Sequence, residues 1–153
     1  MKRTNSITGD GSRTHVPLHQ LVDEVVKDLS LSSPQLTGKS RVINQVATDL
    51  VINTCEETFF AVIHGMLHAI IANATEGDIQ VSARELFGNT VRISVRDNNC
   101  YNTYAVACAL QRIVPLAEQV GGFLNIMNQR QKITTVEFSF PYTKEDNIHG
   151  HDD

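Results

Sequence analysis

The stretch Ala105-Val-Ala-Cys-Ala-Leu-Gln-Arg-Ile-Val-Pro-Leu-Ala-Glu-Gln-Val-Gly-Gly122-Phe-Leu-Asn-Ile decides the predicted fold, because it contains a helix, its end and the strand after it. The helix is expected over 103–120, and the two glycines end it because glycine favours the position just past a helix. A strand over 123–127 follows. We expect it to form a hairpin with a second strand over 133–140, around the turn 128–131.

The same order, a helix followed by two strands, occurs twice before this stretch. Apolar residues at helical spacing predict a first helix that begins near Leu18 and stops near Ser32-Ser-Pro34. Two short strands are expected next, over 41–46 and 50–53, with Ala47-Thr-Asp49 as the turn between them. We interpret these two strands as a pair.

A second and longer helix is predicted over Glu56–Ala74. Its apolar stripe recurs every three or four residues and comprises Phe59, Phe60, Ile63, Met66, Leu67, Ile70 and Ile71. The alternating segments 78–85 and 90–96 then predict a hairpin around Phe87-Gly-Asn89. Strands that arrive as hairpins between helices favour an α+β fold, a two-layer sandwich of a mixed sheet with three helices on one face.

Composition indicates an ordinary soluble protein. The 153 residues are enough for one domain with a real core, and 41% of them are apolar. A formal net charge of −4 gives no reason to expect nucleic acid or anionic membrane as a partner. Three cysteines without paired spacing predict reduced thiols, and no apolar segment follows the N-terminus as in a signal peptide, so we expect a cytoplasmic protein.

The chain is predicted to consist of one domain with two loose ends. Residues 1–14 are rich in small polar and charged residues, and 143–153 end in a polar, acidic run, so both segments are expected to be disordered. The domain is expected over 15–142. Its longest apolar stretch, from Phe59 to Ala74, is interrupted by polar residues and is too short to span a bilayer.

Several motifs in the region 21–141 resemble the ATP-binding domain of the gyrase, Hsp90 and histidine-kinase superfamily (the Bergerat fold), and histidine kinases in particular. The long helix carries Gly65-Met-Leu-His-Ala-Ile70 where the kinases carry NLLxNA, and Cys55 stands where an Asp commonly precedes it. Val91-Arg-Ile-Ser-Val-Arg-Asp97-Asn-Asn-Cys-Tyr101 is similar to the strand and DxGxG motif. Val136-Glu-Phe-Ser-Phe-Pro141 resembles the last strand.

The resemblance also implies which residues would bind a nucleotide, and this sequence departs from the pattern at most of them. The glycines of the phosphate loop, GxGLGL, correspond to Ala105, Ala107 and Ala109. Glycine is needed there because the backbone approaches a phosphate and visits positive φ. The Asn that would bind Mg²⁺ corresponds to Ala69, which has no side-chain oxygen. The acidic or amide position before it is Gly65.

The Asp that would recognise adenine is retained as Asp97, but the two glycines of its motif correspond to Asn99 and Tyr101. Only residues 102–104 remain in place of the flexible lid. No Lys or Arg lies between Asp97 and Arg112 to neutralise a triphosphate. We therefore expect a groove that is open and shallow, or filled by side chains such as Tyr101 and Tyr104.

Alternatives remain open for several of these residues. Asn73 could take the place of the metal-binding Asn in a shifted register, but that register leaves only five residues between Asn73 and Ile79 in which to end the helix and enter the strand. Asn73 also suits the end of a helix. Asp97 could instead fold onto its own backbone in a turn. His64 and His68 have metal-compatible spacing but no third ligand nearby in the sequence.

These departures predict a degenerate histidine-kinase-type domain that acts as a non-catalytic signalling or interaction module, with no cofactor. Its expected partner is a protein, either a kinase helical hairpin or a response regulator, and a homodimer is possible. The competing hypothesis is an active kinase domain, of the histidine-kinase or anti-sigma-factor serine-kinase type, that uses ATP and Mg²⁺. A third hypothesis is a small-molecule pocket in the old adenine site, lined by Ile93, Val95 and the face around Gly65 and Ala69.

Overall fold

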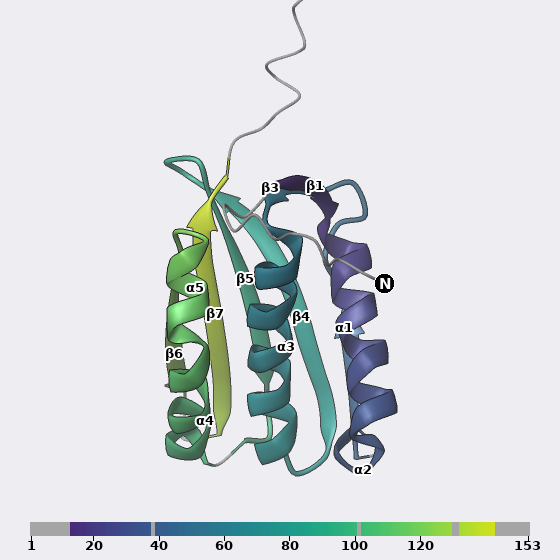
Figure 1. Cartoon of the computed structure of the whole chain (residues 1–153). Coiled ribbons are helices and arrows are strands. Elements are labelled where there is room, and N and C mark those ends of the chain that lie inside the picture. The colour runs from purple at the N-terminus through teal and green to yellow at the C-terminus, as the bar shows by residue number, and fades with distance from the viewer. Residues whose placement is uncertain (1–12, 38, 101, 130–131, 143–153) are drawn as a thin grey trace, which may run out of the picture.

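The computed structural model describes residues 13–37, 39–100, 102–129 and 132–142. In chain order its elements are β1 (Thr14–Pro17), α1 (Leu18–Ser32), α2 (Pro34–Thr37), β2 (Ser40–Asn44), β3 (Val51–Thr54), α3 (Glu56–Asn73), β4 (Gly77–Leu86), β5 (Thr90–Asp97), α4 (Thr103–Leu110), the 3₁₀ turn η2 (Gln111–Ile113), α5 (Val114–Gln119), β6 (Phe123–Gln129) and β7 (Ile133–Pro141). Figure 1 shows α1, α3 and the α4–α5 segment side by side in front of the sheet.

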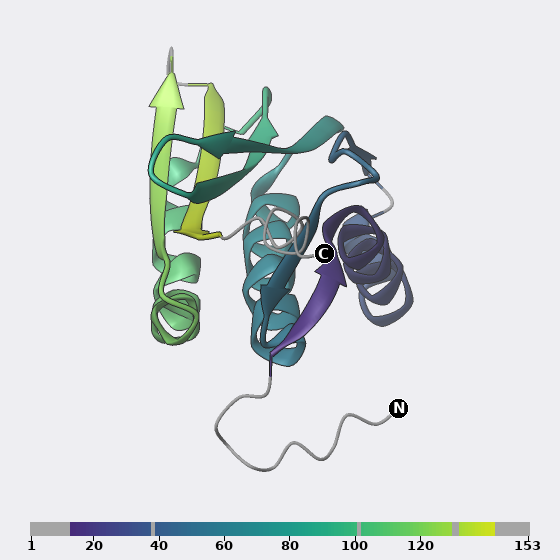
Figure 2. The same cartoon turned by 90° about the horizontal axis from the view of Figure 1, so that it is seen from above.

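The main sheet has five strands in the order β2-β4-β5-β7-β6. β2 is parallel to β4, and the other neighbouring pairs are antiparallel. The view from above shows the helices on one side of this sheet (Figure 2). The predicted α+β class, the two layers and the mixed sheet with three helices on one face are therefore confirmed.

One predicted strand pair was wrong. β2 and β3 do not form a hairpin, because β2 pairs with β4, and β3 pairs with β1 in a separate two-stranded ladder. The connection between them is fixed to the start of α1: His19 Nδ1 lies 2.7 Å from the carbonyl oxygen of Val46, and the N–H of Leu18 donates to the carbonyl of Leu50. Both Val46 and Leu50 are buried, so the connection packs into the core. The predicted turn at 47–49 does form, since the N–H of Leu50 donates to the carbonyl of Ala47, but it does not join two paired strands.

Strand β1 was not predicted. Its first residue, Thr14, pairs with Thr54 of β3, although 1–14 was expected to be disordered. Of the other residues in that segment, the structure describes Arg13 alone, because residues 1–12 lie outside the described residues. The predicted tail 143–153 also lies outside them.

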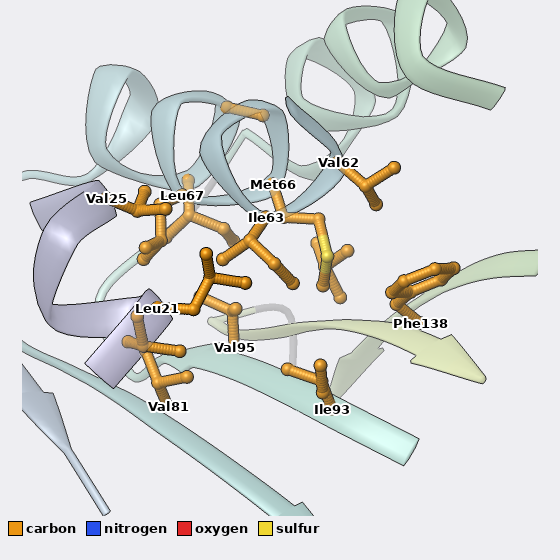
Figure 3. Close-up of a cluster of buried hydrophobic side chains, with 14 of the residues drawn as sticks. Leu21, Val25, Val62, Ile63, Met66, Leu67, Val81, Ile93, Val95 and Phe138 are labelled. Carbon is orange, nitrogen blue, oxygen red and sulfur yellow. The ribbon is translucent and has the colours of Figure 1, made fainter. Parts of the chain in front are cut away.

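The core lies between α3 and the sheet (Figure 3). Ile63, Met66 and Leu67 of α3 are fully buried against residues from α1 and the sheet. The whole predicted stripe except the half-buried Phe60 is buried, which confirms the central position of this helix. Glu56 and Glu57 occupy its first turn, where negative charge suits the helix dipole.

The third helix is not continuous over 103–120 as predicted. It consists of α4, the turn η2 and α5, and Pro115 lies in the first turn of α5. Proline has no backbone N–H and its ring clashes with the carbonyl four residues earlier, here that of Gln111. The chain therefore tightens into a 3₁₀ turn before it starts a new helix.

Within the part of the chain that the structure describes, no helix is long and apolar enough to cross a membrane.

Candidate functional site

The residues that the resemblance singled out lie where α3 faces α4 and η2, next to the end of β5. The closest approach is at Gly65, in the middle of α3. A Cβ placed on Gly65 would lie 2.5 Å from Cγ2 and 3.1 Å from Cδ1 of Ile113 in η2. Ile113 therefore occupies the space into which any side chain at position 65 would extend, and the two segments pack this closely because residue 65 is glycine.

Ala69, one helical turn further along α3, is 2% exposed and offers no side-chain oxygen. Its backbone carbonyl accepts a hydrogen bond of 2.9 Å from Nδ2 of Asn73. Asn73 is the last residue of α3, and β4 starts at Gly77 after three residues. The chain thus ends a helix and enters a strand within this distance, so loop length alone does not exclude the shifted register. The hydrogen bond of Asn73 to the Ala69 carbonyl is a contact expected of a residue at the end of a helix.

Asp97 ends β5 on the helix side of the sheet, between Ile79 and Thr134 in the neighbouring strands. It is 1% exposed. Its Oδ1 accepts a hydrogen bond of 3.0 Å from the N–H of Asn99, the turn that we considered as an alternative role. Its Oδ2 is buried and has no hydrogen-bond partner within the described residues. Burial raises the pKa of the Asp97 carboxyl, and the Asn99 hydrogen bond lowers it to a smaller extent.

The loop after Asp97 is fastened to its surroundings on two sides. On one side Nδ2 of Asn99 donates to the carbonyl of Glu76 at 2.8 Å, and the Thr75 hydroxyl donates to the carbonyl of Asn99. On the other side the N–H of Cys100 donates to the carbonyl of Lys132. Cys100 is itself fully buried. The loop is thereby held to the connection between α3 and β4 and to Lys132, just before β7.

At the start of α4 the backbone is already capped by the protein. Asn102 is the N-cap, and its side-chain oxygen accepts a hydrogen bond of 3.2 Å from the N–H of Ala105. Ala105 and Ala107 are half-buried, and Ala109 packs against the core. Ala105, the first of the three positions that the resemblance aligned with glycines, thus has its amide satisfied by a side chain three residues away.

A hydroxyl and amide cluster joins α4 to the last two strands. The hydroxyls of Thr103 and Thr134 lie 3.0 Å apart, and Nδ2 of Asn128 donates to both of them. Thr134 also reaches the carbonyl of Cys100. These contacts hold the beginning of α4 close to the sheet.

Other predicted candidates lie apart from this region. Tyr104 is 80% exposed and so does not fill the site, while Tyr101 lies outside the described residues. A hydrogen bond to exposed Cys108 raises the pKa of Tyr104. Ile93 and Val95, considered as the lining of a small-molecule pocket, are fully buried in the core (Figure 3).

The histidines of α3 contact other partners. His64 Nε2 lies 3.1 Å from Oδ2 of Asp28 in α1, and its ring stacks on that of His68. In the described ranges no group of three or more His, Cys, Asp or Glu side chains is arranged to hold a metal ion.

Sequence reasoning missed two residues of this region. Asn102 could have been found, because Asn directly before a helix is a common N-cap. Ile113 gave no comparable signal, since its contact with Gly65 depends on how the helix breaks before Pro115.

No family profile and no curated protein matches the sequence. Solved structures do match in shape. The chain aligns with the Acinetobacter baumannii histidine kinase AdeS with a TM-score of 0.70 and 11% identity, over 86% of this chain and 68% of that one. The chain has the fold of histidine-kinase catalytic domains.

Two further histidine-kinase structures agree with this assignment of the fold. The cytoplasmic segment of histidine kinase QseC aligns with a TM-score of 0.63 and 18% identity, over 92% of this chain and 85% of that one. The catalytic domain of histidine kinase ThkA aligns with a TM-score of 0.66 and 15% identity, over 87% of this chain and 97% of that one. At such identities the likeness concerns the histidine-kinase-type fold and not the chemistry of the site.

Proposed function

We propose that this chain is a non-catalytic module of two-component-type signalling, which keeps the histidine-kinase-type fold and uses it to contact a protein partner in the cytoplasm. The proposal rests on the fold together with the contents of the former nucleotide site. In that site the positions that would bind phosphates and metal are taken up by contacts within the chain.

The observation that carries the proposal is the contact of Gly65 with Ile113. The resemblance implies an acidic or amide group at position 65 and the Mg²⁺ ligand one helical turn later, at position 69. Here a Cβ at position 65 would already overlap Ile113, at 2.5 Å from its Cγ2. A catalytic side chain therefore has no room there.

The residues present do not fit ATP with Mg²⁺. A hard cation requires oxygen ligands, and buried Ala69 supplies none. The N–H of Ala105 is bonded to Asn102 and is not free to meet a phosphate. The absence of Lys and Arg between Asp97 and Arg112 removes the cationic support on which phosphoryl transfer depends.

One observation favours the alternative, an active domain with a divergent site. Asp97 Oδ2 is a buried acceptor without a hydrogen-bond partner among the described residues, and such an acceptor suits the amino group of adenine. Residual adenine affinity is therefore compatible with the proposed module. Magnesium-dependent ATP binding is not.

Titration calorimetry with adenosine, ADP and ATP, each with and without Mg²⁺, separates the two functions. The proposed module should bind the three ligands equally weakly and show no effect of Mg²⁺. Asp97→Asn should abolish whatever adenosine binding exists, whereas Asp49→Asn, in the exposed turn before β3, should leave it unchanged. Micromolar, magnesium-dependent binding of ATP by the unmodified chain would contradict the proposal and support the active kinase.

The partner class follows from the same proposal. A helical hairpin of a kinase and a response regulator are the two protein surfaces that a domain of this kind would contact, and self-association is a third possibility. Light scattering coupled to size-exclusion chromatography of the full chain, alone and mixed with each candidate, measures these associations directly.

A further inference from the structure

The face of the main sheet that points away from the helices is polar and positively charged. Residues opposite one another on neighbouring strands point to the same side of a sheet. On this side Arg84 of β4 is opposite Arg92 of β5, and Gln80 is opposite Arg96. Among the described residues no helix covers this side, as the view from above illustrates (Figure 2).

This face contains a hollow of about 490 Å³. Its floor lies where Ser82 and Ser94 are opposite each other, because their side chains are much shorter than those of the arginines in the adjacent rows. The charged residues that line the hollow are Arg84, Arg92, Arg96 and Glu137. They give the hollow a net charge of about +2 at neutral pH, in a chain whose formal net charge is −4.

The arginines are only partly neutralised by the protein. Arg92 Nε lies 3.8 Å from Oε1 of Glu137 and donates to the Ser139 hydroxyl. Arg96 Nε donates to the neutral amide oxygen of Asn98. Exposed Arg84 has no ion-pair partner in the described part of the chain. Like charges directly opposite each other, as at Arg84 and Arg92, destabilise a sheet, and an external anion would relieve this repulsion.

We propose that this hollow binds an extended acidic segment of a protein partner. Carboxylates are the chemistry that fits, because guanidinium groups bind them through two parallel hydrogen bonds. The proposal goes beyond the proposed function, since this face lies across the sheet from the nucleotide-site residues and its binding does not depend on whether that site is degenerate.

The spacing of the charges specifies the segment. Arg92 and Arg96 are four residues apart on β5, about 13 Å along a strand. An extended peptide places residues i and i+4 at the same separation, so one carboxylate can meet each end of the hollow. Glu137 is opposite Ser94, midway between the two arginines, and it would repel a third carboxylate. The segment should therefore be acidic at i and i+4 and uncharged at i+2.

The test is calorimetry of the full chain with an acetylated, amidated peptide Thr-Glu-Thr-Ser-Thr-Glu-Thr. The matched control peptide, Thr-Thr-Ser-Glu-Glu-Thr-Thr, has the same net charge and adjacent carboxylates. We expect the first peptide to bind at least about tenfold more tightly than the control, and its affinity to fall with added salt. Equal affinities for the two peptides, or preference for heparin or duplex DNA over both, would overturn the proposal.

Variants locate the site. Arg84→Gln and Arg96→Gln should each weaken binding of the first peptide by about tenfold, because each removes one charge-assisted contact. Lys27→Gln and Arg112→Gln are charge-matched controls in exposed positions of the helical layer and should leave binding unchanged. Circular dichroism checks that all four variants are folded. If the controls weaken binding as much as the two sheet variants, the attraction is diffuse and the hollow is not the site.

A variant with the opposite effect gives a second measurement. Glu137→Gln removes the central negative charge, so the peptide Thr-Glu-Thr-Glu-Thr-Glu-Thr should bind this variant more tightly than it binds the unmodified chain. The same peptide with Ser at its centre should gain less affinity from Glu137→Gln. Equal gains in affinity for the two peptides would contradict the proposed placement of the peptide across Ser94.

Discussion

The side-chain oxygen of Asn102 accepts a hydrogen bond of 3.2 Å from the backbone N–H of Ala105, so α4 carries its own cap at its first turn. The four N–H groups at the start of a helix otherwise have no partner within it. Ala105, which the sequence resemblance aligned with the first phosphate-loop glycine, is therefore part of a stabilising interaction.

Asn102→Ala should lower the free energy of unfolding by about 1 kcal/mol, because loss of a helix cap typically costs this amount. Asn102→Asp keeps an acceptor and should lose much less. Urea denaturation of the three proteins gives the comparison. Inorganic phosphate should not stabilise Asn102→Ala more than the unmodified chain, and a phosphate-dependent gain in that variant would show that the cap alone had blocked an anion site.

The contact between Gly65 and Ile113 predicts that Gly65→Ala lowers stability when residue 113 is Ile and raises it when residue 113 is Ala. Gly65→Ala alone should destabilise the protein by about 1–3 kcal/mol, because the new Cβ would lie 2.5 Å from Ile113 Cγ2. In the background of Ile113→Ala the clash is gone, and the same change should stabilise by about 0.5–1 kcal/mol, the usual gain of Ala over Gly within a helix.

Chemical denaturation of the four proteins in this cycle measures the coupling. A Gly65→Ala effect that is the same in both backgrounds would mean that Ile113 is not what limits the space at position 65.

Truncation of Leu67 to Ala should lower the free energy of unfolding by about 2–5 kcal/mol, because its side chain is fully buried between α3 and the sheet and a cavity would remain. His68→Ala, at the exposed neighbouring position of the same helix, serves as the control and should change stability by less than about 0.5 kcal/mol. Comparable losses in the two variants would be inconsistent with the orientation of α3.

The raised pKa of Asp97 predicts a specific dependence of stability on pH. Burial raises the pKa of its carboxyl above the ordinary value of 3.8, so the folded protein retains the proton over a range in which the unfolded chain has lost it. Its contribution to the free energy of unfolding therefore falls as the pH rises from 3.8 to the folded pKa, and stays constant above that pKa.

Asp97→Asn has no titrating group at this position and provides the reference. The stability of the unmodified chain relative to this variant should decline over that interval and level off at higher pH, as measured by urea denaturation at stepped pH. Two curves that run parallel across the acidic range would show that the pKa of Asp97 is not raised.

Elements with strong local signals could be predicted from the sequence. α3 has an apolar stripe at helical spacing, and the β4–β5 hairpin has a turn with Gly88 and Asn89, both of which have positive φ in the structure. The break between α4 and α5 was also foreseeable, because Pro115 is visible in the sequence, yet the continuous apolar pattern around it favoured one helix.

Long-range pairing could not be predicted in the same way. Strand β2 is short and gives no local sign that its partner is β4, more than thirty residues later, and not the adjacent β3. In the candidate site, the resemblance located Gly65, Ala69 and Asp97 along the sequence. Which residues fill the space beside them depended on tertiary packing.

The pairing of β2 with β4 determines how much of the edge of β4 is open to other chains. β4 is a ten-residue strand, and its outer side would be a long row of unpaired backbone groups without the five residues of β2 beside it. Exposed strands of that length invite pairing with other chains. Residues 40–44 pair with 77–81 and so cover the first half of that side, whereas a fragment starting at β3 would leave the whole side open to pairing with another chain.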